Sequence, residues 1–145
     1  MKKAISIFVF VLLLTPAFAQ EIFSISNEAI QGYDPVAYFK ESKPVKGKKE
    51  LVYVWKGANW HFSSVQNLSD FKSNPEKYVP QYGGYCAYGT AEGHKAPTSA
   101  DAWTVVDEKL YLNYNTEVRK AWSDDKKRFI KKADANWPEV KKQKD

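Results

Sequence analysis

The sequence of 145 residues contains one cysteine, Cys86, one methionine and two histidines, His61 and His94. A single cysteine excludes a disulfide bond within the chain, so a hydrophobic core must stabilise the fold. Aromatic residues make up 15% of the sequence, and their large rings allow a small domain to bury much apolar area with few residues.

Long apolar runs are missing after the first twenty residues. The one apolar run, residues 4–14, follows two lysines and precedes the small residues of Ala17-Phe18-Ala19. This pattern is typical of a secretory signal peptide cut after about Ala19, and the run is roughly half the ~20 residues that a membrane-spanning helix needs. No cysteine follows the expected cut to carry a lipid. We therefore expect residues 1–19 to be removed and the protein to be exported, to a bacterial periplasm.

The net charge of +5 is distributed unevenly. Residues 126–145 carry eight lysines or arginines against three acidic residues. We therefore expect a near-neutral domain over residues 20–125 and a basic C-terminal helix or tail over residues 126–145. Export argues against a nucleic-acid partner, and the tail would allow at most a peripheral contact with an anionic membrane surface.

Two pairs of β-rich runs predict antiparallel hairpins. Residues 51–55 and 59–63 are separated by Lys56-Gly57-Ala58, and residues 102–106 and 109–113 by Asp107-Glu108. Alternation along the first hairpin places Trp60 and Phe62 on a core face and His61 on the opposite face. A looser alternation over residues 21–30 predicts one short additional strand.

Capping residues predict several short helices between and after these hairpins. Asp34 precedes a helix over residues 35–41, Ser64 precedes one that Asn74-Pro75 ends, and a further turn follows to Tyr78. Later helices are predicted to start at Tyr85, at Asn115 or Thr116, and within Ser123-Asp124-Asp125, the last one ending at Trp137-Pro138. The sequence therefore predicts one small α+β domain in which antiparallel hairpins pack against short helices, followed by C-terminal helices.

Residues 78–97 differ from the Lys- and Glu-rich sequence around them, since they hold the only cysteine, one of two histidines, four of nine tyrosines and four of seven glycines. Three of these tyrosines are spaced by three residues and would share one face of a helix. That face would be an aromatic core stripe or the wall of a ligand pocket for a planar molecule such as haem. The predicted pocket residues are Tyr82, Gly83, Gly84, Tyr85 and Tyr88.

Cys86 follows two glycines at an expected helix start, where free backbone N–H groups favour a thiolate. His94 follows eight residues later, close enough along the chain to serve as a second ligand or as the base of a Cys-His pair. His61 is the third candidate ligand. The alternative interpretation is that Cys86 is a small buried apolar side chain.

Several motifs in order carry a resemblance to a known family: residues 32–39, GYDPVAYF; 60–64, WHFSS; 71–78, FKSNPEKY; 80–88, PQYGGYCAY; and 109–115. Together, from about Gly32 to Trp122, they resemble the exported branch of the YHS-domain family. The resemblance implies a small α+β module linked to heavy-metal handling, as in copper-transporting pumps and the cysteine-based TRASH modules. Those relatives bring several cysteines to a metal site, whereas this chain has only one.

The leading hypothesis is a periplasmic binding module, a carrier or sensor, that holds a metal ion or metal cofactor through Cys86 with His94 or His61. Copper or zinc is the expected metal, with haem as the alternative, and no catalytic residue is assigned. A second hypothesis is an enzyme with Cys86 as nucleophile and His94 as base. A third is a non-catalytic domain that binds a protein partner through its aromatic surface.

Overall fold

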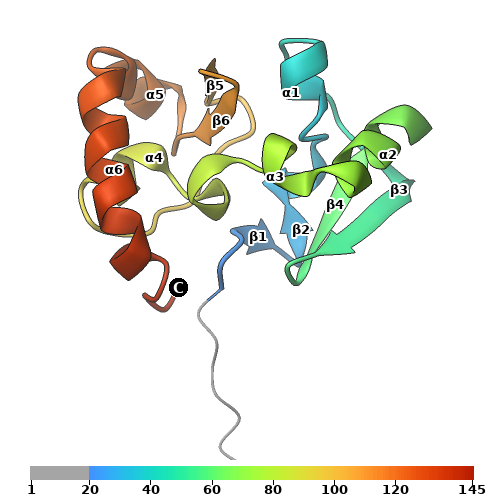
Figure 1. Cartoon of the computed structure of the whole chain (residues 1–145), viewed down its shortest axis with the longest axis horizontal. Helices are drawn as coiled ribbons and strands as arrows, with labels where there is room; N and C mark the ends of the chain where they lie inside the picture. The colour runs from blue at the N-terminus through green and yellow to red at the C-terminus, as the bar shows by residue number, and fades with distance from the viewer. Residues whose placement is uncertain (1–19) are drawn as a thin grey trace, which may run out of the picture.

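The computed structural model describes residues 20–145, so the expected signal peptide lies outside the described residues. Figure 1 shows the N-terminal half of the chain, with the larger sheet, on one side and the C-terminal helices with a small hairpin on the other. The elements are, in order, β1 (Ser24–Ile25), β2 (Glu28–Ala29), a 3-10 turn (Ile30–Gly32), α1 (Ala37–Lys40), β3 (Lys48–Trp55), β4 (Ala58–Phe62), α2 (Val65–Ser73), α3 (Pro75–Tyr78), a 3-10 segment (Gln81–Gly84), α4 (Ala87–Ala91), β5 (Trp103–Val106), β6 (Lys109–Leu112), α5 (Thr116–Ser123) and α6 (Lys126–Val140). This is the small α+β domain that the sequence predicts.

The larger sheet has the strand order β1-β2-β4-β3. Strands β3 and β4 form the first predicted hairpin, in which Lys56 and Gly57 both have positive φ, 48° and 75°, as a two-residue turn between twisted strands requires. The short strand expected in residues 21–30 is instead two strands, and β2 pairs in parallel with β4 at Glu28 and Asn59. Strand β3 also begins at Lys48 rather than at residue 51.

The second predicted hairpin, β5 and β6, forms a separate two-stranded sheet. Its turn residues, Asp107 and Glu108, have φ of 48° and 60°. The hairpin therefore uses the same left-handed turn geometry as the first without a glycine.

Three helix starts, those of α2, α5 and α6, follow the predicted caps, whereas α1 begins at Ala37 rather than at residue 35. The side chains of Ser64, Asn115 and Asp125 accept hydrogen bonds from the backbone N–H three residues later, at 3.1, 2.8 and 3.3 Å. The predicted end of the last helix is wrong, because α6 continues through Pro138 to the buried Val140. Burial of Val140 holds this final turn against the domain even though proline cannot donate a backbone hydrogen bond.

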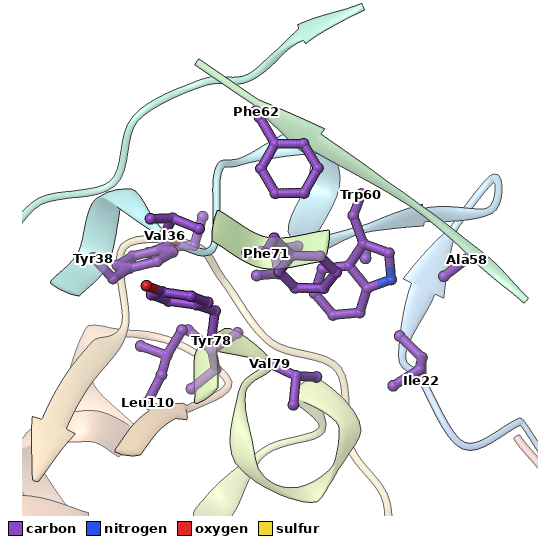
Figure 2. Packing of buried hydrophobic residues seen from close by; sticks show 14 residues of the cluster. Ile22, Val36, Tyr38, Ala58, Trp60, Phe62, Phe71, Tyr78, Val79 and Leu110 are labelled. Carbon is purple, nitrogen blue, oxygen red and sulfur yellow. The ribbon is translucent and has the colours of Figure 1, made fainter. Parts of the chain in front are cut away.

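The main core is built around Phe71 of α2. Its ring centre lies 5.1 Å from that of Trp60 and 5.2 Å from that of Phe62, and Figure 2 shows these two rings of β4 beside it. Both β4 residues are at most 1% exposed, as their predicted core position requires. A second hydrophobic cluster holds the elements of the C-terminal half together. It contains Tyr82, Ala87, Ala91, Tyr111, Trp122, Phe129 and Ala133.

Asp34 does more than cap a helix. Its side chain is fully buried, and its Oδ1 accepts hydrogen bonds from the backbone N–H groups of Val36 and Ala37, at 2.8 and 3.3 Å. Its Oδ2 accepts hydrogen bonds from the Ser63 backbone N–H at 2.8 Å, from the Ser63 hydroxyl at 2.7 Å and from the Asn67 side-chain amide at 2.8 Å. One carboxylate therefore connects the start of α1, the end of β4 and the first turn of α2.

We expect Asp34→Asn to lower the free energy of unfolding by about 2–4 kcal/mol, because the new amide N–H₂ would face donors and leave buried groups unpaired. Urea unfolding of residues 20–145 measures this change. The exposed Asp101→Asn is the matched control and should unfold within about 0.5 kcal/mol of the wild type. Equal stability of the two variants would show that the network does not hold the fold.

Candidate functional site

The chain makes a left-handed turn at the centre of the predicted site. Tyr82, Gly83 and Gly84 have φ of 58°, 62° and 86°. A Cβ on Gly83 would lie 1.8 Å from the carbonyl oxygen of Glu21, because the N-terminal segment crosses here and the Phe23 N–H donates to the Gly83 carbonyl at 2.9 Å. Helix α4 therefore starts at Ala87, after this turn, and not at Tyr85 as the sequence predicts.

The prediction that the three tyrosines share one helical face is wrong, because this turn separates them. The Tyr82 hydroxyl donates to Asp134 Oδ1 at 2.8 Å, and the Tyr88 ring lies 4.8 Å from the ring centre of Phe129. The Tyr85 hydroxyl lies 2.7 Å from Asp145 Oδ1. The three side chains thus serve three different contacts with the C-terminal half.

A cleft of about 420 Å³ opens beside Tyr82 and Gly83, which are the only predicted pocket residues that line it. Aromatic rings of Trp55 and Trp137 stand at its sides with Tyr82. The remaining lining residues are charged, polar or aliphatic: Glu21, Ile22, Lys56, Glu76, Val79, Pro80, Gln81, Lys109 and Asp134. The cleft lies between the N-terminal and C-terminal halves. Its walls combine aromatic rings with both positively and negatively charged side chains.

Some of the charges in the cleft pair with each other. Lys56 Nζ lies 3.2 Å from Glu21 Oε1 and 3.7 Å from Glu76 Oε1, and 4.8 Å from the ring centre of Trp55. These side chains are substantially exposed to solvent, so their mutual pairing contributes little stability.

Cys86 is the N-cap of α4 and is buried. Its Sγ accepts the Gly89 N–H at 3.5 Å and lies 3.5 Å from Asn113 Oδ1. Because the Tyr88 N–H also donates to Asn113 Oδ1, at 3.0 Å, the amide oxygen must face the sulfur. The thiol therefore donates its proton to Asn113 and is neutral.

Burial raises the pKa of the Cys86 thiol, and hydrogen bonds from the backbone N–H groups of Gly89, Tyr114 and Tyr88 offset this only in part. The sequence-based expectation of a thiolate at this helix start is wrong, because desolvation outweighs the local N–H groups. The alternative interpretation of Cys86, a small buried side chain, fits its surroundings.

The three predicted metal ligands do not come together. His94 is exposed, although its backbone N–H bonds to the Gly89 carbonyl at 3.0 Å close to Cys86. His61 lies on β4, on the other side of the molecule from α4 (Figure 1). Within residues 20–145, no group of three or more His, Cys, Asp or Glu side chains is arranged to hold a metal ion. A site made jointly of Cys86, His94 and His61 does not fit this structure.

Lys95 gathers the two ends of the described chain. Its ammonium group, on a side chain that is 6% exposed, donates to the Gln20 carbonyl at 2.9 Å, the Gln143 carbonyl at 2.8 Å and Asp145 Oδ1 at 2.9 Å. It also lies 4.7 Å from the ring centre of Tyr85. Figure 1 shows the C-terminus close to the first described residues. The predicted basic tail is thus a helix packed on α4 whose end is tied down.

Residues 36–82 match the family model of the YHS domain. This segment is therefore similar to a YHS domain. The match confirms the resemblance over about a third of the chain, from α1 to the start of the cleft, and it ends before Cys86 and His94. No curated protein and no solved structure matches the chain.

The YHS domain is often linked to metal binding, yet the matched segment here contains no cysteine. In the part of the chain that the structure describes, no helix is long and apolar enough to cross a membrane.

Sequence reasoning missed three residues that shape the candidate sites. Asn113 orients Cys86, Asp134 accepts from Tyr82, and Glu28 contacts His61 Nε2. Asn113 and Asp134 lie 27 and 52 residues from their partners. No local spacing pattern signals contacts of this range.

We expect Cys86 to react slowly with iodoacetamide at neutral pH in the native protein, because its thiol is buried and protonated. Mass spectrometry should detect modification within minutes only after unfolding in urea. An exposed cysteine introduced as Ser73→Cys is the matched control and should react at the rate of a free thiol. Equally fast reaction at both positions would show that Cys86 is an accessible thiolate.

Stability should fall as the pH rises. Burial raises the pKa of Tyr111 to about 12 and the pKa values of Tyr82, Tyr85 and Cys86 above their usual ranges. As the pH rises, the unfolded chain loses these protons first, at about pH 8.5 for cysteine and about 10 for tyrosine. The stability that these four groups contribute is therefore fully present below these values and is lost above them. Urea midpoints should decline from about pH 8.5 and more steeply above about pH 10. Tyr111→Phe should reduce the decline, and the exposed Tyr114→Phe should not.

Proposed function

We propose that the protein is an exported, non-catalytic binding module that holds a small ligand in the cleft beside Tyr82. The observation that carries this proposal is the cleft itself, about 420 Å³ in volume, with Trp55, Tyr82 and Trp137 at its sides. Its volume lies within the roughly 300–1,000 Å³ that small-molecule sites occupy. A YHS domain that ends at the cleft agrees with a binding role.

The lining suggests the chemistry of the ligand. Aromatic sides favour a flat or partly apolar molecule, and two lysines with three carboxylates offer partners to charged groups of either sign. No histidine or cysteine lines the cleft, so haem would find neither of these axial ligands there. A compact polar organic molecule, such as a zwitterion, fits this lining better than haem.

The buried thiol argues against the alternative of a Cys86-dependent enzyme. A nucleophilic cysteine needs a thiolate that is hydrogen-bonded to a base, whereas the Cys86 thiol donates to the amide oxygen of Asn113, which is not a base. Copper or zinc binding through Cys86 would require the sulfur to leave this hydrogen-bonded position and lose its proton. Both roles are therefore less well supported than binding in the cleft.

Export to the periplasm is part of the proposal and rests on the N-terminal sequence. Two lysines, an apolar run of residues 4–14 and Ala17-Phe18-Ala19 form the pattern of a cleaved signal peptide. A fold that needs no disulfide bond within the chain agrees with one cysteine in an oxidising compartment.

We expect the cleft to bind a flat charged dye, and we choose 1-anilinonaphthalene-8-sulfonate as the anionic probe and thioflavin T as the cationic probe. For whichever dye binds, Lys109→Trp should lower the affinity by at least about fivefold, because the added ring would fill the mouth of the cleft. Lys120→Trp places the same ring on exposed α5 and is the matched control. Fluorescence titration measures both variants. No binding of either dye, or equal affinities in the two variants, would count against the cleft as a ligand site.

A further inference from the structure

A second concave surface lies on the outer face of the larger sheet. This groove, about 640 Å³ in volume, is formed mainly by β2, β3 and β4 and has His61 among its lining residues. Val52 and Val54 of β3 stand at its surface with 42% and 65% of their area exposed. The groove is distinct from the cleft beside Tyr82, since the two share no lining residue.

His61 is held tightly at the base of this groove. It is opposite Val52 in the β3–β4 register and only 9% exposed. Gly47 lies directly against it, since a Cβ on Gly47 would be 2.5 Å from the His61 Cβ. The strand alternation that directs Trp60 and Phe62 into the core therefore directs this imidazole outward, and the chain then covers it.

The ring nitrogens of His61 have different partners. Nδ1 lies 3.2 Å from the carbonyl oxygen of Lys48, and a carbonyl only accepts, so Nδ1 carries a proton. In the neutral ring the lone pair is then on Nε2. This orientation, with one nitrogen bound to a backbone carbonyl and the other free to coordinate, is the one that metal-binding histidines usually adopt.

Nε2 faces the carboxylate of Glu28. Glu28 Oε2 contacts His61 Nε2, but Nε2 is buried and has no partner with hydrogen-bond geometry. The other carboxylate oxygen, Oε1, accepts from the Asn59 side-chain amide at 3.4 Å, which orients the group. Two atoms with lone pairs therefore meet, and their contact is favourable only when Nε2 carries a proton or when both atoms bind the same metal ion.

We propose that His61 Nε2 and Glu28 Oε2 are the two protein ligands of a divalent metal ion of the zinc, nickel and copper(II) class. An imidazole nitrogen and a carboxylate oxygen are the donors that these ions accept. The groove leaves room for water to occupy the remaining coordination positions. Lys46 and Lys49 line the same groove and would repel a cation. With only two protein ligands, we therefore expect weaker binding than at the three- and four-ligand zinc sites of other proteins. A proton on Nε2 satisfies the same contact, so an ion pair without metal is the competing outcome.

Isothermal titration of residues 20–145 with Zn²⁺ and with Ni²⁺ tests this assignment. The wild type should bind one ion, and His61→Gln and Glu28→Gln should bind at least about tenfold more weakly. His94→Gln and Cys86→Ser are the matched controls and should bind as the wild type does. Absence of binding to the wild type, or loss of binding in Cys86→Ser with retention in His61→Gln, would overturn the proposal.

A measurement on the unaltered protein removes any doubt about misfolded variants. The chain has only two histidines, so their side-chain ¹⁵N signals are readily assigned. Adding Zn²⁺ should shift the Nε2 signal of His61 and leave that of His94 in place, whereas an unshifted His61 signal overturns the assignment. Dye binding in the cleft should be the same with and without Zn²⁺, so failure of the metal site and failure of the cleft are separately visible.

Discussion

The buried carboxylate of Asp34 is the constraint on which the N-terminal half depends. A charged group without solvent contact is tolerated only when both oxygens are satisfied, and here they accept from α1, Ser63 and Asn67. Ser63 directly follows β4, an inner strand of the larger sheet, and β4 carries both His61 and the core ring of Trp60. The carboxylate thus sets the end of β4 relative to α2, and with it the position of the outer groove.

The sequence was sufficient for features that depend on neighbours along the chain. Caps at Ser64 and Asn115, a hairpin turn that contains Gly57, and the inward direction of Trp60 and Phe62 all follow from local rules of helix ends, turns and strand alternation. Even Asp34 was recognised as a capping residue. Its second oxygen, which binds Ser63 and Asn67 about 30 residues away, was not predictable from spacing.

The candidate site was less predictable because tertiary contacts decide its chemistry. Spacing by three predicted a shared face for Tyr82, Tyr85 and Tyr88, but the crossing of Glu21 over Gly83 requires a left-handed turn there. A helix start favours a thiolate at Cys86, but burial beside Asn113 has the larger effect on its pKa. In both cases a distant segment outweighed a correct local preference.

The ammonium group of Lys95 places Gln20 and Asp145 at one pole of the molecule. A short peptide linker can therefore join Gln20 to Asp145 without deforming the domain, which makes residues 20–145 suited to circular permutation, with new ends opened in an exposed turn such as Lys56-Gly57. The same closeness means that a partner domain fused at either end leaves from the same pole.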